Sequence, residues 1–245
     1  MNFFNNDDIT FCVGIHVFND FEFLEKSLES LSETNFLKNT KIFFLDNCSS
    51  QENVKKLILQ FTKDNINKVQ SFYFRNNLHI DVLENNLNLI RQMRKIDSDF
   101  YVILDSKQTY NPDWLYELKK IILLQTNKNE CIYTLLHVPI NLKHMYFNLL
   151  EEHGNFNVYH SVSETGTVIP KEYLKFFEEE LNFNEYYQRN VDGYVSWYIS
   201  LLCNLRIVGP KKDFIKQLTL SDILNKNLKL ITQELNKNKK NTLLE

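Results

Sequence analysis

The sequence predicts an α/β fold in which a mostly parallel, Rossmann-like sheet carries helices on both faces. Short apolar runs rich in β-branched and aromatic residues alternate with longer stretches whose apolar residues recur at helical spacing. Polar residues directly follow several of these runs. Strands that alternate with helices are joined by right-handed crossovers, which bring the loops after the strands to one edge of the sheet.

Five strands are predicted in the first half of the chain. They cover residues 9–18, 41–45, 69–74, 100–104 and 131–136. A helix with an apolar stripe is predicted after each of the first four strands. Asn19 and Ser50 are expected to cap the first two helices, and Asn111 with Pro112 is expected to begin the fourth.

The alternation is less regular after about residue 140. We expect a loop and short strand in residues 161–170, a helix from Lys171 and a helix opened by Asp192. A short strand at 206–208 and a last helix capped by Ser221 follow. Since no repeat or linker is visible, residues 1–245 are interpreted as one domain. Its predicted parts are a first half (9–138), a second half (139–215) and a C-terminal helix with a polar tail (216–245).

Composition excludes several classes of protein. The net charge of −3 is not that of a general nucleic-acid binder. No apolar run reaches the ~18–20 residues of a membrane span, and the first residues lack the basic and apolar regions of a signal peptide. The cysteines have neither zinc-site nor disulfide-framework spacing (Cys12, Cys48, Cys131, Cys203). A cytosolic protein with reduced thiols is therefore predicted.

Polar side chains at the predicted strand ends are expected to meet at one edge of the sheet, where open α/β sheets bind ligands. They are His16, Asn19, Asp46, Asn76, Asn77 and Asp105. Asp46 has the alternative role of closing a local turn. His16 and His137 have the alternative of joining Asp105 around a metal. Asp97-Ser98-Asp99 precedes a strand, so it is expected on the solvated surface at the opposite edge.

Four short motifs stand at these strand ends in a characteristic order. They are His16-Val17-Phe18-Asn19, Asp46-Asn47-Cys48-Ser49-Ser50-Gln51, Asp105-Ser106-Lys107 and Pro112-Asp113-Trp114-Leu115. Together they resemble the motifs of the inverting family 2 glycosyltransferases of the GT-A fold. The resemblance covers residues 9–120 well and continues weakly to about residue 210, where Asp192 falls near the family's catalytic acidic residue.

The resemblance implies a nucleotide-sugar-binding half at residues 9–138 and an acceptor half at 139–215. A hexosyl or N-acetylhexosaminyl group would be transferred, with inversion, from a nucleotide-sugar donor, UDP-linked for preference. The acceptor would be a hydroxyl of a glycan or of a lipid-linked molecule. The implied roles are base recognition for Asp46, ribose or metal binding for Asp105, diphosphate binding for Lys107 and general base for Asp192. His16, Asn19 and Asn76 are expected to complete the substrate site. Polysaccharide biosynthesis in the cytoplasm, or at the inner membrane surface, fits these roles.

Two positions depart from the family pattern. Lys107 replaces the second Asp of the DxD motif, which in the family holds Mn²⁺ or Mg²⁺. Its ammonium would repel a divalent cation or contact the diphosphate itself. Cys48 replaces a usual Gly, so this turn tests whether a positive φ is needed. Transfer without a metal is one interpretation. An inactive GT-A-like binding module, or a partner subunit of another transferase, is the alternative.

Other readings of the fold and assembly are also distinguished by the sequence. Sugar-nucleotide pyrophosphorylases and dinucleotide dehydrogenases need a Gly-rich loop after the first strand, but only five glycines and no GxGxxG occur. The apolar stripe of the last helix is expected either to pack on its own domain or to form a homo-oligomer contact.

Overall fold

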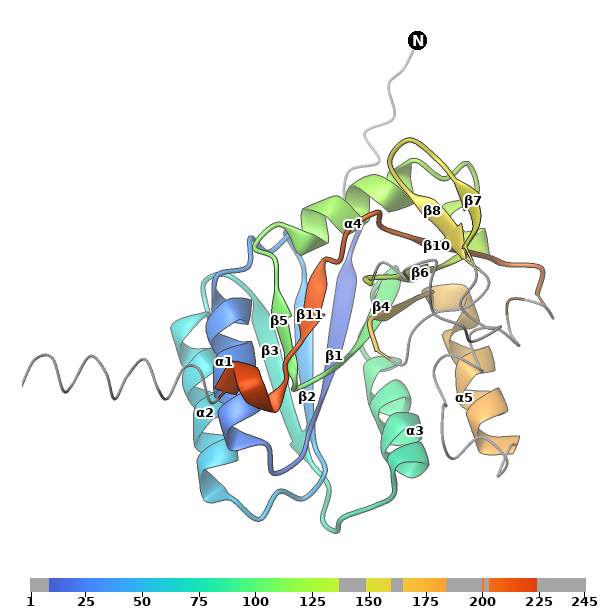
Figure 1. The fold of residues 1–245 in the computed structure, drawn as a ribbon. Coiled ribbons are helices and arrows are strands. Elements are labelled where there is room, and N and C mark those ends of the chain that lie inside the picture. The colour runs from blue at the N-terminus through green and yellow to red at the C-terminus, as the bar shows by residue number, and fades with distance from the viewer. Residues whose placement is uncertain (1–8, 137–148, 160–164, 184–199, 201–202, 224–245) are drawn as a thin grey trace, which may run out of the picture.

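The computed structural model describes residues 9–136, 149–159, 165–183, 200 and 203–223. Nine strands form one sheet in the order β3-β2-β1-β4-β9-β6-β10-β8-β7 (Figure 1). Their bounds are β1 Phe11–Val17, β2 Lys41–Asp46, β3 Gln70–Arg75, β4 Phe100–Asp105, β6 Cys131–Thr134, β7 Leu149–Glu152, β8 Asn157–Tyr159, β9 Thr167–Pro170 and β10 Arg206–Gly209. The predicted parallel half, β3-β2-β1-β4, is confirmed.

Helices cover both faces of this sheet, as predicted (Figure 1). They are α1 Phe21–Ser32, α2 Glu52–Asp64, α3 Val82–Met93, α4 Trp114–Leu123 and α5 Leu174–Phe183. Alternate residues of β1 point to opposite faces. Phe11, Val13 and Ile15 belong to the apolar cluster with α1, α2 and α4. Cys12 belongs to the second cluster, with α3 and the start of α5.

Gly14 allows α3 to pack closely on β1. A Cβ atom at this position would lie 2.3 Å from Sδ of Met93 and 3.0 Å from Cδ1 of Leu89. Both of these α3 side chains are fully buried. The small residue therefore sets how near the helix, and the polar groups it carries, can come to the strand ends.

The second half of the sheet is mixed rather than parallel. β9 inserts between β4 and β6 and is antiparallel to both, whereas β10 is parallel to β6. β10 and the helix after Lys171 confirm two predictions. The β7–β8 hairpin was not predicted. A separate two-stranded sheet, β5 (Gln108–Tyr110) with β11 (Ile215–Gln217), was not predicted either. Asp192, His137 and residues 224–245 lie outside the described residues. Residues 220–223 are already helical, so Ser221 lies inside the last helix and is not its N-cap as predicted.

The three helix caps predicted in the first half of the chain are also wrong, by one or two residues. Asp20, not Asn19, is the N-cap of α1, and Gln51, not Ser50, is that of α2. Asn19 has a φ of 49°, and its side chain accepts a hydrogen bond from the Ser50 N–H instead of capping its own helix. Asp113, not Asn111, is the N-cap of α4. The N–H of Asp113 donates to Oδ1 of Asn111, two residues earlier in the chain.

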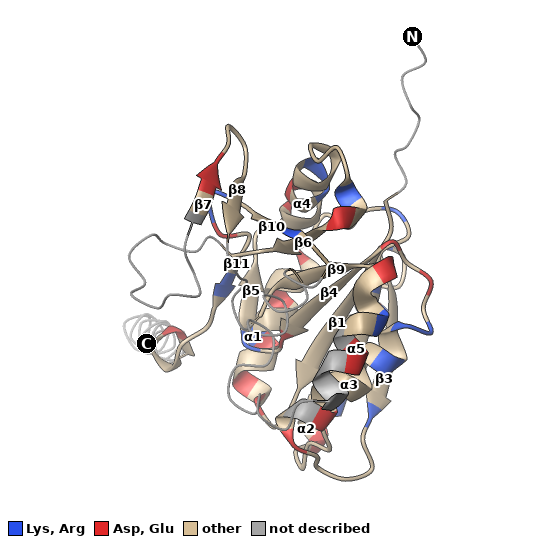
Figure 2. Cartoon of the chain, turned by 90° about the vertical axis from the view of Figure 1, so that its right-hand side faces the viewer, with Lys and Arg blue, Asp and Glu red and all other residues tan. Residues whose placement is uncertain are grey.

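None of the helices within the described ranges is long and apolar enough to cross a membrane. Acidic and basic residues are mixed along α4 and α5 (Figure 2), in keeping with the net charge of −3.

Candidate functional site

Strand register brings the predicted polar residues to one edge of the sheet. His16 of β1 is the register partner of Asp105 on β4, and Val17 is the partner of Asp46 on β2. Asp46 in turn is the partner of Arg75 on β3, and the N–H of Asn76 donates to the Asp46 carbonyl at 2.9 Å. We call the group formed by His16, Asp20, Asp46, Asn76, Asp105 and Lys107 the strand-end site.

Asp46 is buried, and its carboxylate is held by the protein itself. Oδ1 accepts the N–H of Ser49 at 2.8 Å, and Oδ2 accepts the Tyr73 hydroxyl at 2.8 Å. Arg75 Nε lies 3.8 Å from the same Oδ2. Burial, together with the hydrogen bond to Asp46, raises the pKa of Tyr73. The turn-closing alternative for Asp46 is therefore present in the structure. Sequence reasoning missed Tyr73 because it lies in a predicted strand (69–74) that was interpreted only from its apolar residues. Arg75 directly follows that predicted strand and was not assigned to the site.

The loops after β1 and β2 are tied together. The N–H of Asn19 donates to Ser49 Oγ at 3.0 Å, and Asn19 Oδ1 accepts the N–H of Ser50 at 2.8 Å. Cys48 has a φ of 62°, so the turn in which it replaces a usual Gly does take a left-handed residue. This conformation directs consecutive N–H groups of the turn toward Asp46 and Asn19.

A network of asparagine side chains lies beneath this edge. Asn76 Nδ2 donates to Asn47 Oδ1 at 3.0 Å and to Asn85 Oδ1 at 3.1 Å. Asn76 Oδ1 accepts Nδ2 of Asn88 at 2.6 Å. Asn85 Nδ2 then lies 2.9 Å from Nδ1 of His16. Sequence reasoning missed Asn85 and Asn88 because it considered only the apolar stripe of this helix. Their polar side chains close to that stripe could have indicated a buried network.

His16 is held neutral at the end of this network. Burial lowers its pKa to about 4. Since Asn85 presents its amide N–H₂ to Nδ1, that ring nitrogen acts as the acceptor. His16 is thus placed at the predicted edge, but its side-chain hydrogen bond joins it to α3.

Asp105 and Lys107 form the opposite side of the strand-end site. Asp105 Oδ1 accepts the Lys107 N–H at 2.9 Å, and burial raises the pKa of this carboxyl group. The Lys107 ammonium lies 3.0 Å from Asp20 Oδ2, a partner that sequence reasoning missed. Asp20 had no signal of its own, because its neighbour Asn19 was assigned the capping role.

The described side chains of this site do not fit a divalent cation. They contain no group of three His, Cys, Asp or Glu residues able to hold a metal ion. Lys107 brings its positive charge to the carboxylate of Asp20, and this charge partly offsets the rise that burial causes in the pKa of Asp105. A divalent cation at this place would meet that ammonium at close range.

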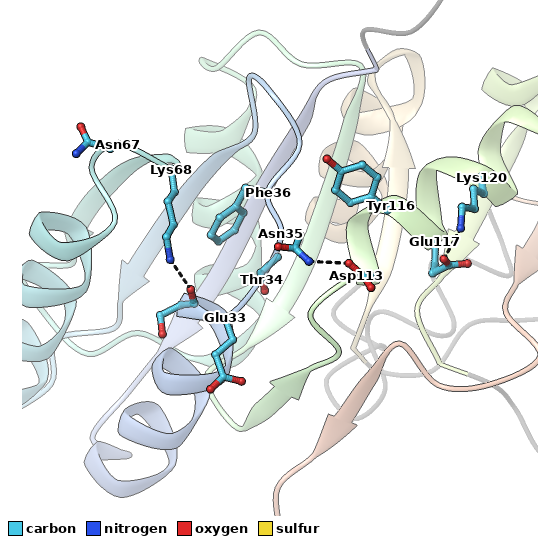
Figure 3. A pocket seen from close by; sticks show the side chains of 11 residues that line it. Glu33, Thr34, Asn35, Phe36, Asn67, Lys68, Asp113, Tyr116, Glu117 and Lys120 are labelled. Atoms are coloured by element: carbon cyan, nitrogen blue, oxygen red, sulfur yellow. Dashed lines mark hydrogen bonds and ion pairs between the residues drawn. The ribbon is translucent and has the colours of Figure 1, made fainter.

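A pocket of about 820 Å³ lies at the opposite edge of the sheet, between the end of α1 and the start of α4 (Figure 3). Its polar side chains pair with neighbours. Asn35 Nδ2 donates to Asp113 Oδ1 at 2.7 Å, and Lys68 Nζ donates to the Ser32 carbonyl at 3.0 Å. Asp97 also lies at this edge, on the surface before β4, as predicted. The pocket is therefore separate from the strand-end site.

The sequence matches the model of glycosyl transferase family 2 over residues 12–135, which is half of the chain. The chain belongs to this family. The matched region contains every described residue of the strand-end site, and the fold is that of a GT-A glycosyltransferase.

Several solved structures have a similar fold. TarS 1-349 from S. aureus in complex with UDP has a TM-score of 0.60 and 16% identity, over 92% of this chain and 65% of that chain. GalNAc-T7 with UDP, GalNAc and Mn²⁺ has a TM-score of 0.65 and 12% identity, over 88% and 45%. The mannosyltransferase PcManGT from Pyrobaculum calidifontis, in complex with GDP-Man and Mn²⁺, has a TM-score of 0.59 and 12% identity, over 82% and 54%.

The match covers only part of these proteins. This chain spans 39% of the full TarS structure and 65% of TarS 1-349. No protein of curated function matches the sequence significantly.

Proposed function

We propose that this chain transfers a sugar from a UDP-linked donor to a hydroxyl of a glycan or lipid-linked acceptor. The observation that carries the proposal is the meeting of Asp46, Asp105 and Lys107 at the strand-end edge of a family 2 fold. The choice of UDP is supported by the TarS complexes with UDP and UDP-GlcNAc and by the GalNAc-T7 complex with UDP.

The donor nucleoside would lie against the loops after β1, β2 and β4. Asp105 uses Oδ1 for the Lys107 N–H, whereas Oδ2 makes no hydrogen bond with the described part of the chain and is available to a ribose hydroxyl. Asp46 would recognise the base with a carboxylate already oriented by Ser49 and Tyr73. Asn19 and Asn76 would fix the loops that surround the nucleoside, and the Asn85 contact would keep His16 neutral beside the ribose.

Departure of the nucleotide requires a positive charge near the developing diphosphate charge. We propose that the Lys107 ammonium supplies this charge without a divalent cation. A lysine ammonium has three N–H donors, which can contact phosphate oxygens. In the structure the ammonium is paired with Asp20.

Inversion would follow from direct attack of the acceptor hydroxyl opposite the leaving diphosphate. A general base must then take the hydroxyl proton. The resemblance assigns this role to Asp192, in the acceptor half at residues 139–215, and we retain it as part of the proposal. The Asp192→Asn variant should abolish transfer while UDP binding persists. Equal loss of both would remove Asp192 from the role of base.

Thermal unfolding with UDP, GDP, CDP and dTDP, each with Mn²⁺ and with EDTA, tests the donor and the metal together. A nucleotide at ~100 times its Kd adds about 2.7 kcal/mol to the stability of the folded state. We expect a rise in Tm with UDP that is equal in Mn²⁺ and EDTA. Lys107→Met should reduce the rise, whereas Lys55→Met, an exposed lysine of α2, should not.

Three results would contradict parts of this proposal. A rise only with another nucleotide would exclude UDP as the donor. A rise that needs Mn²⁺ would exclude Lys107 as the replacement for the metal. Failure of every nucleotide to raise Tm would overturn the transferase proposal.

A further inference from the structure

The ion pair between Asp20 and Lys107 joins two loops that are far apart in the sequence. Asp20 precedes α1, and Lys107 lies between β4 and β5. Asp20 Oδ2 is 3.0 Å from Lys107 Nζ, and the two side chains are 29% and 36% exposed. The ammonium also lies 5.5 Å from the ring centroid of Phe23, in the first turn of α1. Solvent therefore reaches both partners of the ion pair.

The Asp20 carboxylate forms this ion pair and does not cap the helix that follows it. It occupies the N-cap position of α1, where an aspartate side chain commonly accepts an N–H of the first turn. The Asp20 carboxylate makes no such capping bond. Its negative charge is directed to Lys107.

The backbone of Lys107 is fixed on both sides of the residue. Its N–H donates to Asp105 Oδ1 at 2.9 Å, and its carbonyl accepts the Leu218 N–H at 2.7 Å. The ammonium can thus change partners by side-chain rotation, without movement of the loop. A partly exposed ion pair contributes little to stability, so the exchange of one anion for another costs little.

We infer that Asp20 is the counter-ion that the diphosphate of the nucleotide displaces from Lys107. This inference rests on the proposed function. With Asp20 paired to it, Lys107 offers a nearly neutral group to an incoming diphosphate. Asp20 therefore lowers the affinity of the site for the diphosphate, of donor and product alike, and leaves the affinity for the nucleoside unchanged. The residue favours release of the nucleotide product after transfer.

A purely structural role for Asp20 leads to the opposite expectation. If Asp20 served only to hold the lysine in place, its loss would free the long side chain and weaken diphosphate binding. If the carboxylate competes with the diphosphate, its loss must tighten binding. The sign of the change in affinity separates the two roles.

The test measures Kd for UDP and for uridine by calorimetry in EDTA. We compare wild type, Asp20→Asn, Lys107→Met and the double variant, with Glu22→Gln as the matched control. Glu22 is an exposed acidic residue in the first turn of the same helix. Asp20→Asn should tighten UDP binding roughly threefold to tenfold, the effect of ~0.6–1.4 kcal/mol for one removed charge near the surface. Its Kd for uridine should equal that of the wild type.

The remaining variants identify the route of the effect. Lys107→Met should weaken UDP binding and leave uridine unaffected. In the Lys107→Met background, Asp20→Asn should change the Kd for UDP less than it does in the wild type. Glu22→Gln should change it less than twofold, on the order of experimental scatter for a remote surface charge.

The outcomes distinguish the inference from the proposed function. Weaker or unchanged UDP binding in Asp20→Asn, in a wild type that does bind UDP, overturns the inference alone. An equal effect in Glu22→Gln also overturns it, because general surface charge would then explain the change. A folded wild type that binds no UDP overturns the proposed function and the inference with it.

Discussion

Asp105 Oδ1 accepts the backbone N–H of Lys107, two residues further along the chain, at 2.9 Å. The carboxyl group at the end of β4 thereby fixes the turn that carries the lysine. The same group is partly buried, and burial raises its pKa above the usual range for Asp. Ionised Asp105 thus lowers the stability of the folded protein.

We expect Asp105→Asn to stabilise the protein while weakening UDP binding. Asn keeps an oxygen for the Lys107 N–H but carries no charge to desolvate. Because the folded-state pKa lies above the unfolded one, the wild type loses stability as pH rises through that window. The Tm advantage of Asp105→Asn should therefore be absent below about pH 4 and full at pH 7. A gain of ~1 kcal/mol corresponds to about 2–4 °C in a protein of this size.

Asp97→Asn is the matched control for this experiment. Asp97 is exposed at the opposite edge of the sheet, and the hydrogen bond and charge of Lys171 lower its pKa. Its substitution should not raise Tm at pH 7. A drop in Tm for Asp105→Asn at neutral pH would show that the ionised carboxylate is stabilising in the folded state.

His16 should make the protein sensitive to mild acid. Burial lowers its pKa from 6.5 to about 4. Between these two values the unfolded chain binds the proton more readily than the folded one, so stability falls as pH drops through this window. At ~1.4 kcal/mol per pKa unit, the loss amounts to at most about 3 kcal/mol.

Chemical unfolding of wild type and His16→Gln from pH 7 to pH 4 would measure this contribution. The free energy of unfolding of His16→Gln should depend less steeply on pH. Parallel curves for wild type and His16→Gln would contradict a buried neutral His16.

Cys48 should be replaceable by Gly with a gain in stability. Its φ of 62° lies in the left-handed region, which costs a non-Gly residue roughly 1–2 kcal/mol. Gly avoids this cost but loses more entropy on folding, by about 0.5–1 kcal/mol. Cys48→Gly should therefore raise the unfolding free energy by up to ~1 kcal/mol. Cys48→Ala keeps the Cβ atom and serves as the control, for which we expect no gain.

Gly14→Ala should destabilise the contact between β1 and α3. The added methyl group would meet Sδ of Met93 at 2.3 Å, within a fully buried cluster. Overpacking of this kind typically costs ~1–3 kcal/mol. Gly154→Ala is the control, because its Cβ would meet nothing within 4 Å. Thermal unfolding that leaves the two variants equal would show that α3 can shift away freely.

The sequence predicts the first half of the fold well because that half is local. Strands β1 to β4 alternate along the chain with the amphipathic helices α1 to α4, and parallel βαβ units follow from that alternation. The position of β9 between β4 and β6 depends instead on pairing across long stretches of chain. β5 and β11 have three residues each, too few to carry a pattern of their own.

The site was predictable in position but not in its contacts. Strand ends place His16, Asp46 and Asp105 at one edge, whatever their side chains do there. The partner of each side chain depends on loop conformation. Asn19 adopts a positive φ and contacts Ser50, which leaves the N-cap position and the contact with Lys107 to Asp20.

The pairing of β11 with β5, and of Leu218 with Lys107, has a consequence for how the protein is made. On the ribosome, the turn with Asp105 and Lys107 emerges long before residues 215–218. The parallel half can form by then, but the lysine carbonyl still lacks its partner. A chain interrupted before Leu218 would retain the Rossmann-like half with an unanchored Lys107. If Lys107 binds the diphosphate as proposed, the nucleotide site is completed late in synthesis, only after nearly all of the described chain has been translated.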